Sequence, residues 1–254
     1  MEKYRLIDVH CHLEDSLFDT DRESVIRSAQ EMGIAIISSA IETDTWEKGL
    51  EIADGNSSVF FSAGLNPTKY SEIDTAKKWI LEHHDDLVAI GETGLDHYLT
   101  RDHKERNKQQ AAFEELISIA SDMKVPIQIH SRSAGRAALE VLENAEADRV
   151  HMHAFDGKAS LARKASHELG YYFSIPTSVV RSPQKQKLVK AVNIERILIE
   201  TDSPVLSPEK GLRNTPLNLP IVVQEVARIL RRSEEELQEI VLENSLRLYP
   251  RISS

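Results

Sequence analysis

The 254-residue chain contains one cysteine, Cys11, and this scarcity excludes two classes of protein. A single thiol cannot form an internal disulfide, so the chain is not a disulfide-stabilised scaffold. It also cannot supply the several thiolates of a zinc finger. Any bound metal ion must therefore be held by histidines and carboxylates, of which the chain has 10 and 41.

Long hydrophobic runs are also missing. The uninterrupted apolar stretches are only a few residues long, far below the ~20 residues that cross a bilayer. The first residues, MEKYRLIDVH, lack the apolar core of a signal peptide. We therefore expect a soluble cytoplasmic protein without a membrane partner.

Basic residues are fewer than acidic ones: the chain has 31 lysines and arginines against 41 aspartates and glutamates, which gives a formal net charge of −10. This balance argues against a protein that coats nucleic acid by general electrostatic attraction. The net negative charge does not exclude a local basic rim around an acidic metal pocket. Bound dications can make the charge of such a pocket positive.

Short β-rich apolar segments alternate with longer segments of helical periodicity. The strand candidates are Arg5–His10, Ala35–Ala40, Val59–Leu65, Leu87–Glu92, Pro126–His130, Val150–Phe155, Tyr171–Ile175 and Ile197–Asp202. The clearest helix candidates are Asp21–Met32, Arg106–Lys124, Lys158–Leu169 and Ser233–Tyr249. Alternation of this kind indicates parallel strands joined by helical crossovers.

The fold class that follows is α/β, with residues 1–254 as a single (β/α)8 TIM-type barrel domain. About 250 residues is the usual size of this barrel, and Ser233–Tyr249 is expected to be a C-terminal closing helix. An open doubly wound sheet is the alternative. A glycine-rich phosphate loop after the first strand would favour it, but the chain has His-Cys-His there.

Histidines and acidic residues stand at the carboxyl ends of several predicted strands. The candidates for metal ligands are His10, His12, Glu92, His130, His153 and Asp202. In a β/α barrel these strand ends converge on one rim, where catalytic groups gather. A lone histidine at a strand end is more often a hydrogen-bonded core residue, but six polar groups without ions would be costly to bury together. Metal ligation explains the set economically.

Alternation along a strand aims His10 and His12 into the barrel and sends Cys11 outward as a small buried hydrophobe. It also turns inward four polar residues that lie two positions before a proposed ligand: Asp8, Gln128, His151 and Glu200. We expect these four to orient the ligands through hydrogen bonds. For His151, an ordinary core position is an equal alternative.

Five motifs carry a family resemblance. They are Asp-Val-His-Cys-His-Leu at 8–13, Ala-Ile-Gly-Glu-Thr-Gly-Leu-Asp at 89–96, Ile-His-Ser-Arg at 129–132, His-Ala-Phe-Asp-Gly at 153–157 and Ile-Glu-Thr-Asp-Ser-Pro at 199–204. Together they resemble the TatD family of metal-dependent deoxyribonucleases, within the amidohydrolase superfamily. The motifs spread over nearly the whole chain.

The resemblance implies two divalent metal ions and a nucleic-acid substrate. It assigns His10, His12 and Asp202 to one ion, His130 and His153 to the other, and Glu92 to a bridging place that a carboxylated lysine fills in other amidohydrolases. Asp202 and Glu92 are then the catalytic carboxylates, with Asp202 accepting a proton from the attacking water. Four imidazoles suit Zn²⁺ or Mn²⁺, whereas phosphodiester hydrolysis often uses Mg²⁺, so the ion stays open.

Two departures from the family pattern affect the expected substrate contacts, which are Asn66, Arg132 and Arg213. Asn66 stands where the family commonly has a histidine followed by proline, and an amide cannot serve as an acid. Thr215 replaces a glutamate after Arg213 and Asn214. These changes bear on substrate preference more than on metal binding.

Other functions compete with the nuclease. One is a hydrolase that uses the same ions on an aminoacyl ester or a cyclic amide. The other is a non-enzymatic binding protein with structural metals. Closed structural sites usually fill their coordination shell with protein ligands, whereas the six candidates give too few ligands for each of two ions. Oligomeric state cannot be read from the sequence.

Overall fold

Short apolar segments form parallel strands in the order of the chain, as the alternation predicts. The structure is a computed structural model that describes residues 4–252. Its strands are β1 (Leu6–Cys11), β2 (Ile34–Ala40), β3 (Val59–Ala63), β4 (Leu87–Gly94), β5 (Ile127–His130), β6 (Val150–Met152), β7 (Tyr172–Pro176) and β8 (Ile197–Glu200). They form one eight-stranded sheet in the order β1 to β8.

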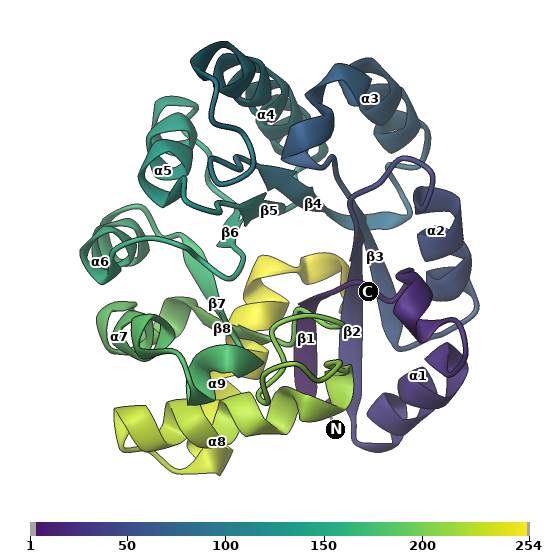
Figure 1. Cartoon of the computed structure of the whole chain (residues 1–254). Coiled ribbons are helices and arrows are strands. Elements are labelled where there is room, and N and C mark those ends of the chain that lie inside the picture. Colours follow the sequence, from purple (N-terminus) through teal and green to yellow (C-terminus); the bar gives the residue numbers. More distant parts are fainter. Residues whose placement is uncertain (1–3, 253–254) are drawn as a thin grey trace.

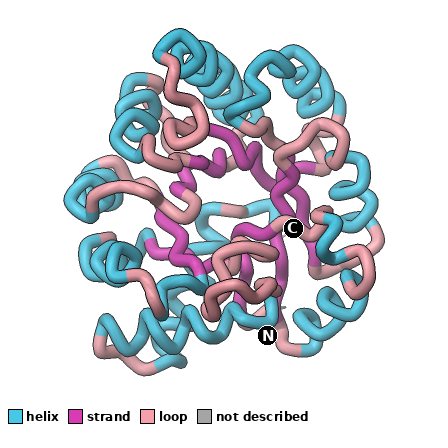
Figure 2. Tube along the Cα trace, viewed as in Figure 1, coloured by secondary structure: helices cyan, strands magenta, loops and turns pink. Residues whose placement is uncertain are grey.

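Helices surround this ring of strands, as Figures 1 and 2 show. They are α1 (Arg22–Glu31), α2 (Trp46–Asp54), α3 (Ile73–Glu82), α4 (His103–Met123), α5 (Gly135–Asn144), α6 (Ala159–Glu168), α7 (Pro183–Ala191), α8 (Leu219–Leu230) and α9 (Glu234–Leu248). Apolar side chains between the strands and these helices form the larger hydrophobic core, and Cys11 is buried within it. The expected (β/α)8 barrel is confirmed.

The first and last strands meet without a regular ladder of paired residues among residues 4–252. Individual hydrogen bonds join them instead. The amide of Asp202 donates to the carbonyl of His10 at 2.9 Å, and the amide of His12 donates to the carbonyl of Ser203 at 2.8 Å. The joint between β1 and β8 is therefore made by the same segments that carry three of the proposed ligands.

The closing helix α9 covers one end of the barrel. Leu242, Leu248 and Tyr249 pack with strand residues such as Ile7 and Val9 in a second hydrophobic cluster. In Figure 1 this yellow C-terminal segment lies behind the strands. Apolar side chains thus close one end of the barrel, and the polar side chains lie at the other end.

The helix bounds differ little from the predicted ones. The predicted ranges of α1, α6 and α9 each exceed the helix by its two capping residues. Helix α4 begins three residues before the predicted Arg106, because the Asp102 carboxylate caps the amides of Lys104 and Glu105. Across residues 4–252, no helix has the length and apolarity needed to span a bilayer.

Candidate metal centre

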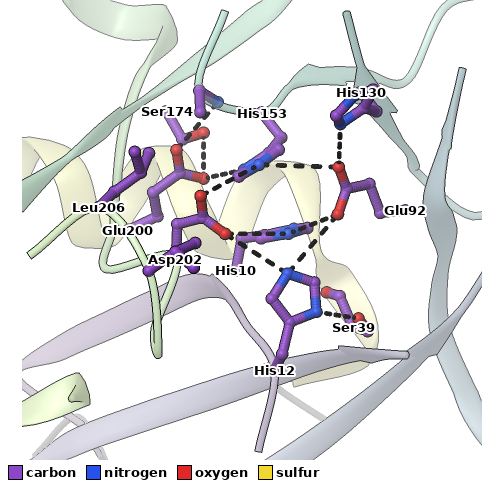
Figure 3. A network of polar contacts seen from close by, with 12 residues as sticks. His10, His12, Ser39, Glu92, His130, His153, Ser174, Glu200, Asp202 and Leu206 are labelled. Carbon is purple, nitrogen blue, oxygen red and sulfur yellow. Dashed lines mark hydrogen bonds and ion pairs between the residues drawn. The ribbon is translucent and has the colours of Figure 1, made fainter. Parts of the chain in front are cut away.

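The proposed ligands converge on one rim from five different strands. His10 lies within β1 and His12 follows it, while Glu92 lies in β4 and His130 ends β5. His153 and Asp202 stand just past the ends of β6 and β8. Figure 3 shows these side chains pointing toward one another.

Two glycines let β4 approach β5 closely beside Glu92. A Cβ atom on Gly94 would lie 2.2 Å from the carbonyl oxygen of His130, and one on Gly91 would lie 2.6 Å from Cβ of Gln128. Both glycines also have φ near +140°, a conformation that side chains disfavour. This close approach brings the Glu92 carboxylate beside the His130 imidazole.

The two oxygens of Glu92 face different histidines. Oε2 lies 3.2 Å from Nε2 of His10 and 3.6 Å from Nε2 of His12. Oε1 lies 2.6 Å from Nδ1 of His130 and 3.8 Å from Nε2 of His153. One buried carboxylate thus stands between two pairs of imidazoles.

Asp202 completes the group from the opposite side. Its Oδ1 lies 3.4 Å from Nε2 of His12, and its Oδ2 lies 3.7 Å from Nε2 of His153. The residue has a φ of +54°, in the left-handed region that aspartate tolerates better than most residues. This turn of the backbone brings the carboxylate back over the barrel mouth.

Three imidazoles use Nδ1 for a protein hydrogen bond and direct Nε2 to the centre. Nδ1 of His10 lies 3.0 Å from Oε1 of Gln128, and Nδ1 of His12 lies 2.7 Å from the carbonyl of Ser39. Nδ1 of His153 lies 2.8 Å from Oε2 of Glu200. Because all three partners are acceptors, each Nδ1 donates its proton to the protein, and Nε2 is the atom that faces the centre.

His130 differs from the other three histidines. Its Nδ1 faces Glu92, and its Nε2 lies 3.0 Å from Oδ2 of Asp96. Burial disfavours the charged imidazole, but the two carboxylates outweigh burial and raise the pKa of His130 to about 10. Ligation of an ion by His130 would therefore require the loss of a proton and of one carboxylate contact.

Charge at the centre is arranged in favour of ionised carboxylates. Burial alone would raise the pKa of Glu92, but His153, His10 and His130 outweigh it and hold that pKa well below its usual range. In the same way, burial opposes protonation of His153, but Glu200, Asp202 and Glu92 raise its pKa to about 9. Carboxylates and protonated imidazoles at the centre thus stabilise each other's charges.

The residues present fit divalent ions. Nε2 of His10 is fully buried and makes no hydrogen bond with the described residues, although a donor or an ion is needed to compensate its burial. Two groups of ligand atoms lie close enough together to hold an ion. They are His10, Glu92 and His153, and His10, His12 and Asp202.

A chain of hydrogen bonds runs beneath the centre and supports its histidines. Tyr249, just past α9, has its hydroxyl 3.1 Å from Nε2 of Gln128 and 2.6 Å from Nδ1 of His151. Nε2 of His151 lies 2.7 Å from Oγ of Ser174, which donates to Glu200 at 2.5 Å. Gln128 and Glu200 therefore contact the proposed ligands His10 and His153 directly, whereas His151 links them from below.

Burial lowers the pKa of His151 to about 3, so this histidine is neutral. As the sequence analysis allowed, it is a hydrogen-bonded histidine of the barrel core.

Asp8 does not face the centre as strict alternation predicted. The register of β1 against β2 shifts between Asp8 and Cys11, which breaks the alternation. The Asp8 carboxylate instead accepts from the amide of Thr201 at 2.8 Å and from its hydroxyl at 2.5 Å. Asp8 therefore ties β1 to the end of β8, next to Asp202, rather than orienting a histidine side chain.

A cavity of about 550 Å³ opens above the centre. Among the expected substrate contacts, Arg132 and Asn66 line it. The guanidinium of Arg132 lies 3.9 Å from the centre of the Tyr98 ring, which is 53% exposed. The Asn66 amide is already used, since Nδ2 donates to Glu42 and Oδ1 accepts from Thr68.

Arg213 does not line this cavity. Its guanidinium donates to both carboxylate oxygens of Asp21 and to the carbonyl of Leu17. The side chain thus fastens the loop after β8 to the segment before α1. This placement does not support the substrate contact expected from the sequence.

Sequence reasoning missed three residues around the centre. Asp96 could have been found, since it lies four residues after Glu92 in the Gly-Glu-Thr-Gly-Leu-Asp motif. No sequence signal placed Tyr249 beneath the histidines. Lys185 also lines the cavity, but it reaches there from a helix, where strand-end reasoning does not apply.

Residues 7–250 match the protein family described as TatD related DNase. The chain is 37% identical over 265 residues to putative deoxyribonuclease TATDN3 of Mus musculus, covering 98% of this chain and 90% of that relative. It is 35% identical over 262 residues to deoxyribonuclease TATDN3 of Homo sapiens, covering 97% and 95%. The fold is similar to the solved structure of YJJV, a TatD homolog from Escherichia coli, with a TM-score of 0.89 at 24% identity over 98% of this chain and 99% of that one.

Proposed function

Since the chain belongs to the TatD-related DNase family and is a metal-dependent hydrolase, we propose that it is a deoxyribonuclease that cleaves phosphodiester bonds with two divalent ions. The observation that carries the two-ion proposal is the position of Glu92. Its Oε2 faces His10 and His12, and its Oε1 faces His130 and His153. A bridging carboxylate needs this division of its oxygens.

The proposed ligand sets follow from this division. His10, His12 and Asp202 would hold one ion, His130 and His153 would hold the other, and Glu92 would contribute to both. The first set coincides with one of the two groups whose ligand atoms lie close together. His130 would complete the second set if its imidazole lost a proton and gave up one of its contacts with Glu92 and Asp96.

Bound ions supply an acidified water and polarise the scissile group. The protein's own carboxylates divide the remaining work. Glu92 stays ionised because its neighbours hold its pKa well below the usual range, so it holds cations rather than moving protons. Asp202 lines the cavity and is the base that accepts the proton of the attacking water.

The rim of the cavity supports a nucleic-acid substrate. Arg132 lines the cavity and presents a cation to an anionic backbone. The Tyr98 ring carries this guanidinium on one face, and because the residue is 53% exposed, it adds an aromatic surface for a nucleobase to the rim. A cation and an aromatic ring at one edge are the parts that single-stranded nucleic acid requires.

Hydrolysis of end-labelled DNA tests the proposal. Metal-stripped protein is resupplied with Mg²⁺, Mn²⁺ or Zn²⁺ and mixed with single- or double-stranded DNA, with a His10→Ala/His12→Ala variant as the control. Metal-dependent shortening that the variant lacks is the expected result, and it also identifies the working ion. Intact DNA together with stoichiometric bound metal would refute the nuclease and favour the ester or amide hydrolase. The cytoplasmic location stays a prediction.

A further inference from the structure

A buried lysine stands in the wall of the cavity. Lys185, in α7, is 9% exposed and lines the cavity together with His153 and Asp202. Its Nζ donates to the carbonyl of Ala154 at 2.7 Å and to the carbonyl of Phe155 at 2.8 Å. An ammonium group has three donors, so one N–H remains for another acceptor.

The charge of Lys185 has no close counterion. Among residues 4–252, no carboxylate oxygen lies within ion-pair distance of Nζ, and its two partners are neutral carbonyls. Burial lowers the pKa of this ammonium, against the longer-range attraction of Glu200, Asp156 and Asp202. A buried charge without a counterion is costly, so an anion that binds beside it would compensate that cost.

The ammonium is held at a fixed place beside the centre. Ala154 directly follows His153 and has a φ of +35°, a left-handed conformation that is strained for alanine. Its amide donates to Oε1 of Glu200 at 2.9 Å while its carbonyl accepts from Lys185. Both the amide and the carbonyl of Ala154 are therefore fixed, and Lys185 is held by the residue that directly follows the proposed ligand His153.

We propose that Lys185 binds the scissile phosphate, with its remaining N–H donating to a non-bridging phosphate oxygen while the two carbonyls hold Nζ in place. This inference rests on the proposed nuclease function and identifies the Lys185 ammonium as a cation that contacts the phosphate of the substrate. The phosphodiester carries the negative charge that Lys185 lacks. A neutral ester has no anionic oxygen for this ammonium to bind.

The alternative is that Lys185 only holds the loop after β6. A purely structural lysine would affect metal content and every substrate alike, because the same loop carries His153. A phosphate-binding lysine affects anionic ligands selectively. The two roles are therefore separable by comparing an anionic substrate with a neutral one.

The test compares Lys185→Met, which keeps the aliphatic stem, with Lys185→Arg, which keeps the charge. Lys187→Met is the matched control, since Lys187 lies on the exposed face of the same helix. Each metal-loaded protein is assayed for kcat/KM on bis(p-nitrophenyl) phosphate and on p-nitrophenyl acetate. Metal content and the calorimetric affinity for inorganic phosphate are measured alongside.

We expect Lys185→Met to lower kcat/KM on the diester roughly 10- to 100-fold and to weaken phosphate binding by a similar factor. Metal content and activity on the acetate should change less than about threefold, and Lys185→Arg should recover part of the loss. Equal losses on both substrates, or unchanged phosphate affinity, would overturn the assignment. If the wild-type protein is inactive on this small diester, the DNA assay above decides the nuclease and phosphate calorimetry still decides the role of Lys185.

Discussion

The hydroxyl of Tyr249 lies 2.6 Å from Nδ1 of His151, at the floor of the barrel. This contact fixes the direction of the hydrogen bonds beneath the centre. The Ser174 hydroxyl donates to Glu200, so it accepts from Nε2 of His151. His151 Nδ1 must then accept from Tyr249, whose oxygen in turn accepts from Gln128. A residue after the last long helix thereby supports the histidines of the rim.

Replacing Tyr249 with phenylalanine tests this support. The change removes a hydroxyl that satisfies two buried partners, and an unsatisfied buried group costs about 1–3 kcal/mol. We expect the free energy of unfolding, measured with urea and circular dichroism, to fall by about that amount. Tyr98→Phe is the control because its ring is exposed, and an equal loss in both variants would contradict the argument.

Gln128→Leu should weaken metal binding without removing a ligand. Gln128 accepts from Nδ1 of His10 and so keeps Nε2 aimed at Glu92. Loss of such a partner typically reduces metal affinity about 10- to 100-fold. Competition with a chromogenic chelator measures the affinity. The control is Gln110→Leu, on the exposed face of α4, which should leave the metal affinity unchanged. If Gln128→Leu also leaves the metal affinity unchanged, the hydrogen bond does not orient His10.

Glu92→Gln should lower turnover and metal content more than Gln128→Leu does. The amide cannot offer two anionic oxygens to two ions, so the loss of turnover should exceed the ~10- to 100-fold expected of a supporting residue. Metal content, counted by elemental analysis, should fall below two ions per chain. Unchanged metal content and turnover would disprove the bridging role.

Arg132→Ala should change how DNA binding responds to salt. Each phosphate contact contributes about 0.7 to the slope of log affinity against log salt on single strands. We therefore expect the slope to decrease by about 0.7 and KM for DNA to rise. Arg163→Ala, an exposed arginine of α6, provides the comparison. Identical slopes in all three proteins would remove Arg132 from the substrate site.

Removal of the ions should lower thermal stability. Ligands that bind only the folded state stabilise it by about 2.7 kcal/mol at a hundredfold excess over Kd. We expect chelator-treated protein to melt at a lower temperature and metal addition to restore the Tm. The His10→Ala/His12→Ala variant should show a smaller response, and an equal response would place the stabilising ion elsewhere.

Much of the fold was predictable because strand and helix periodicities are local. Predicted strand bounds fell within about three residues of the observed ones, and the capping residues marked the ends of α1, α6 and α9. The convergence of the six candidate ligands was predictable for the same reason, since a parallel barrel gathers its strand ends on one rim.

Other features depend on three-dimensional detail that no local pattern contains. The register shift in β1 turned Asp8 away from the centre. Arg213 pairs with Asp21, nearly two hundred residues earlier in the chain, so its proximity in sequence to the site was misleading. Lys185 is a long side chain on a helix, and its reach into the cavity is set by the packing of α7 rather than by spacing.

The joint between β1 and β8 has a consequence for protein synthesis. His10 and His12 leave the ribosome early, whereas Asp202 follows after nearly two hundred further residues, and the hydrogen bonds between these segments form only when both are present. A growing chain therefore holds an incomplete centre until β8 has emerged. For most of its synthesis the nascent polypeptide therefore lacks the complete set of proposed ligands.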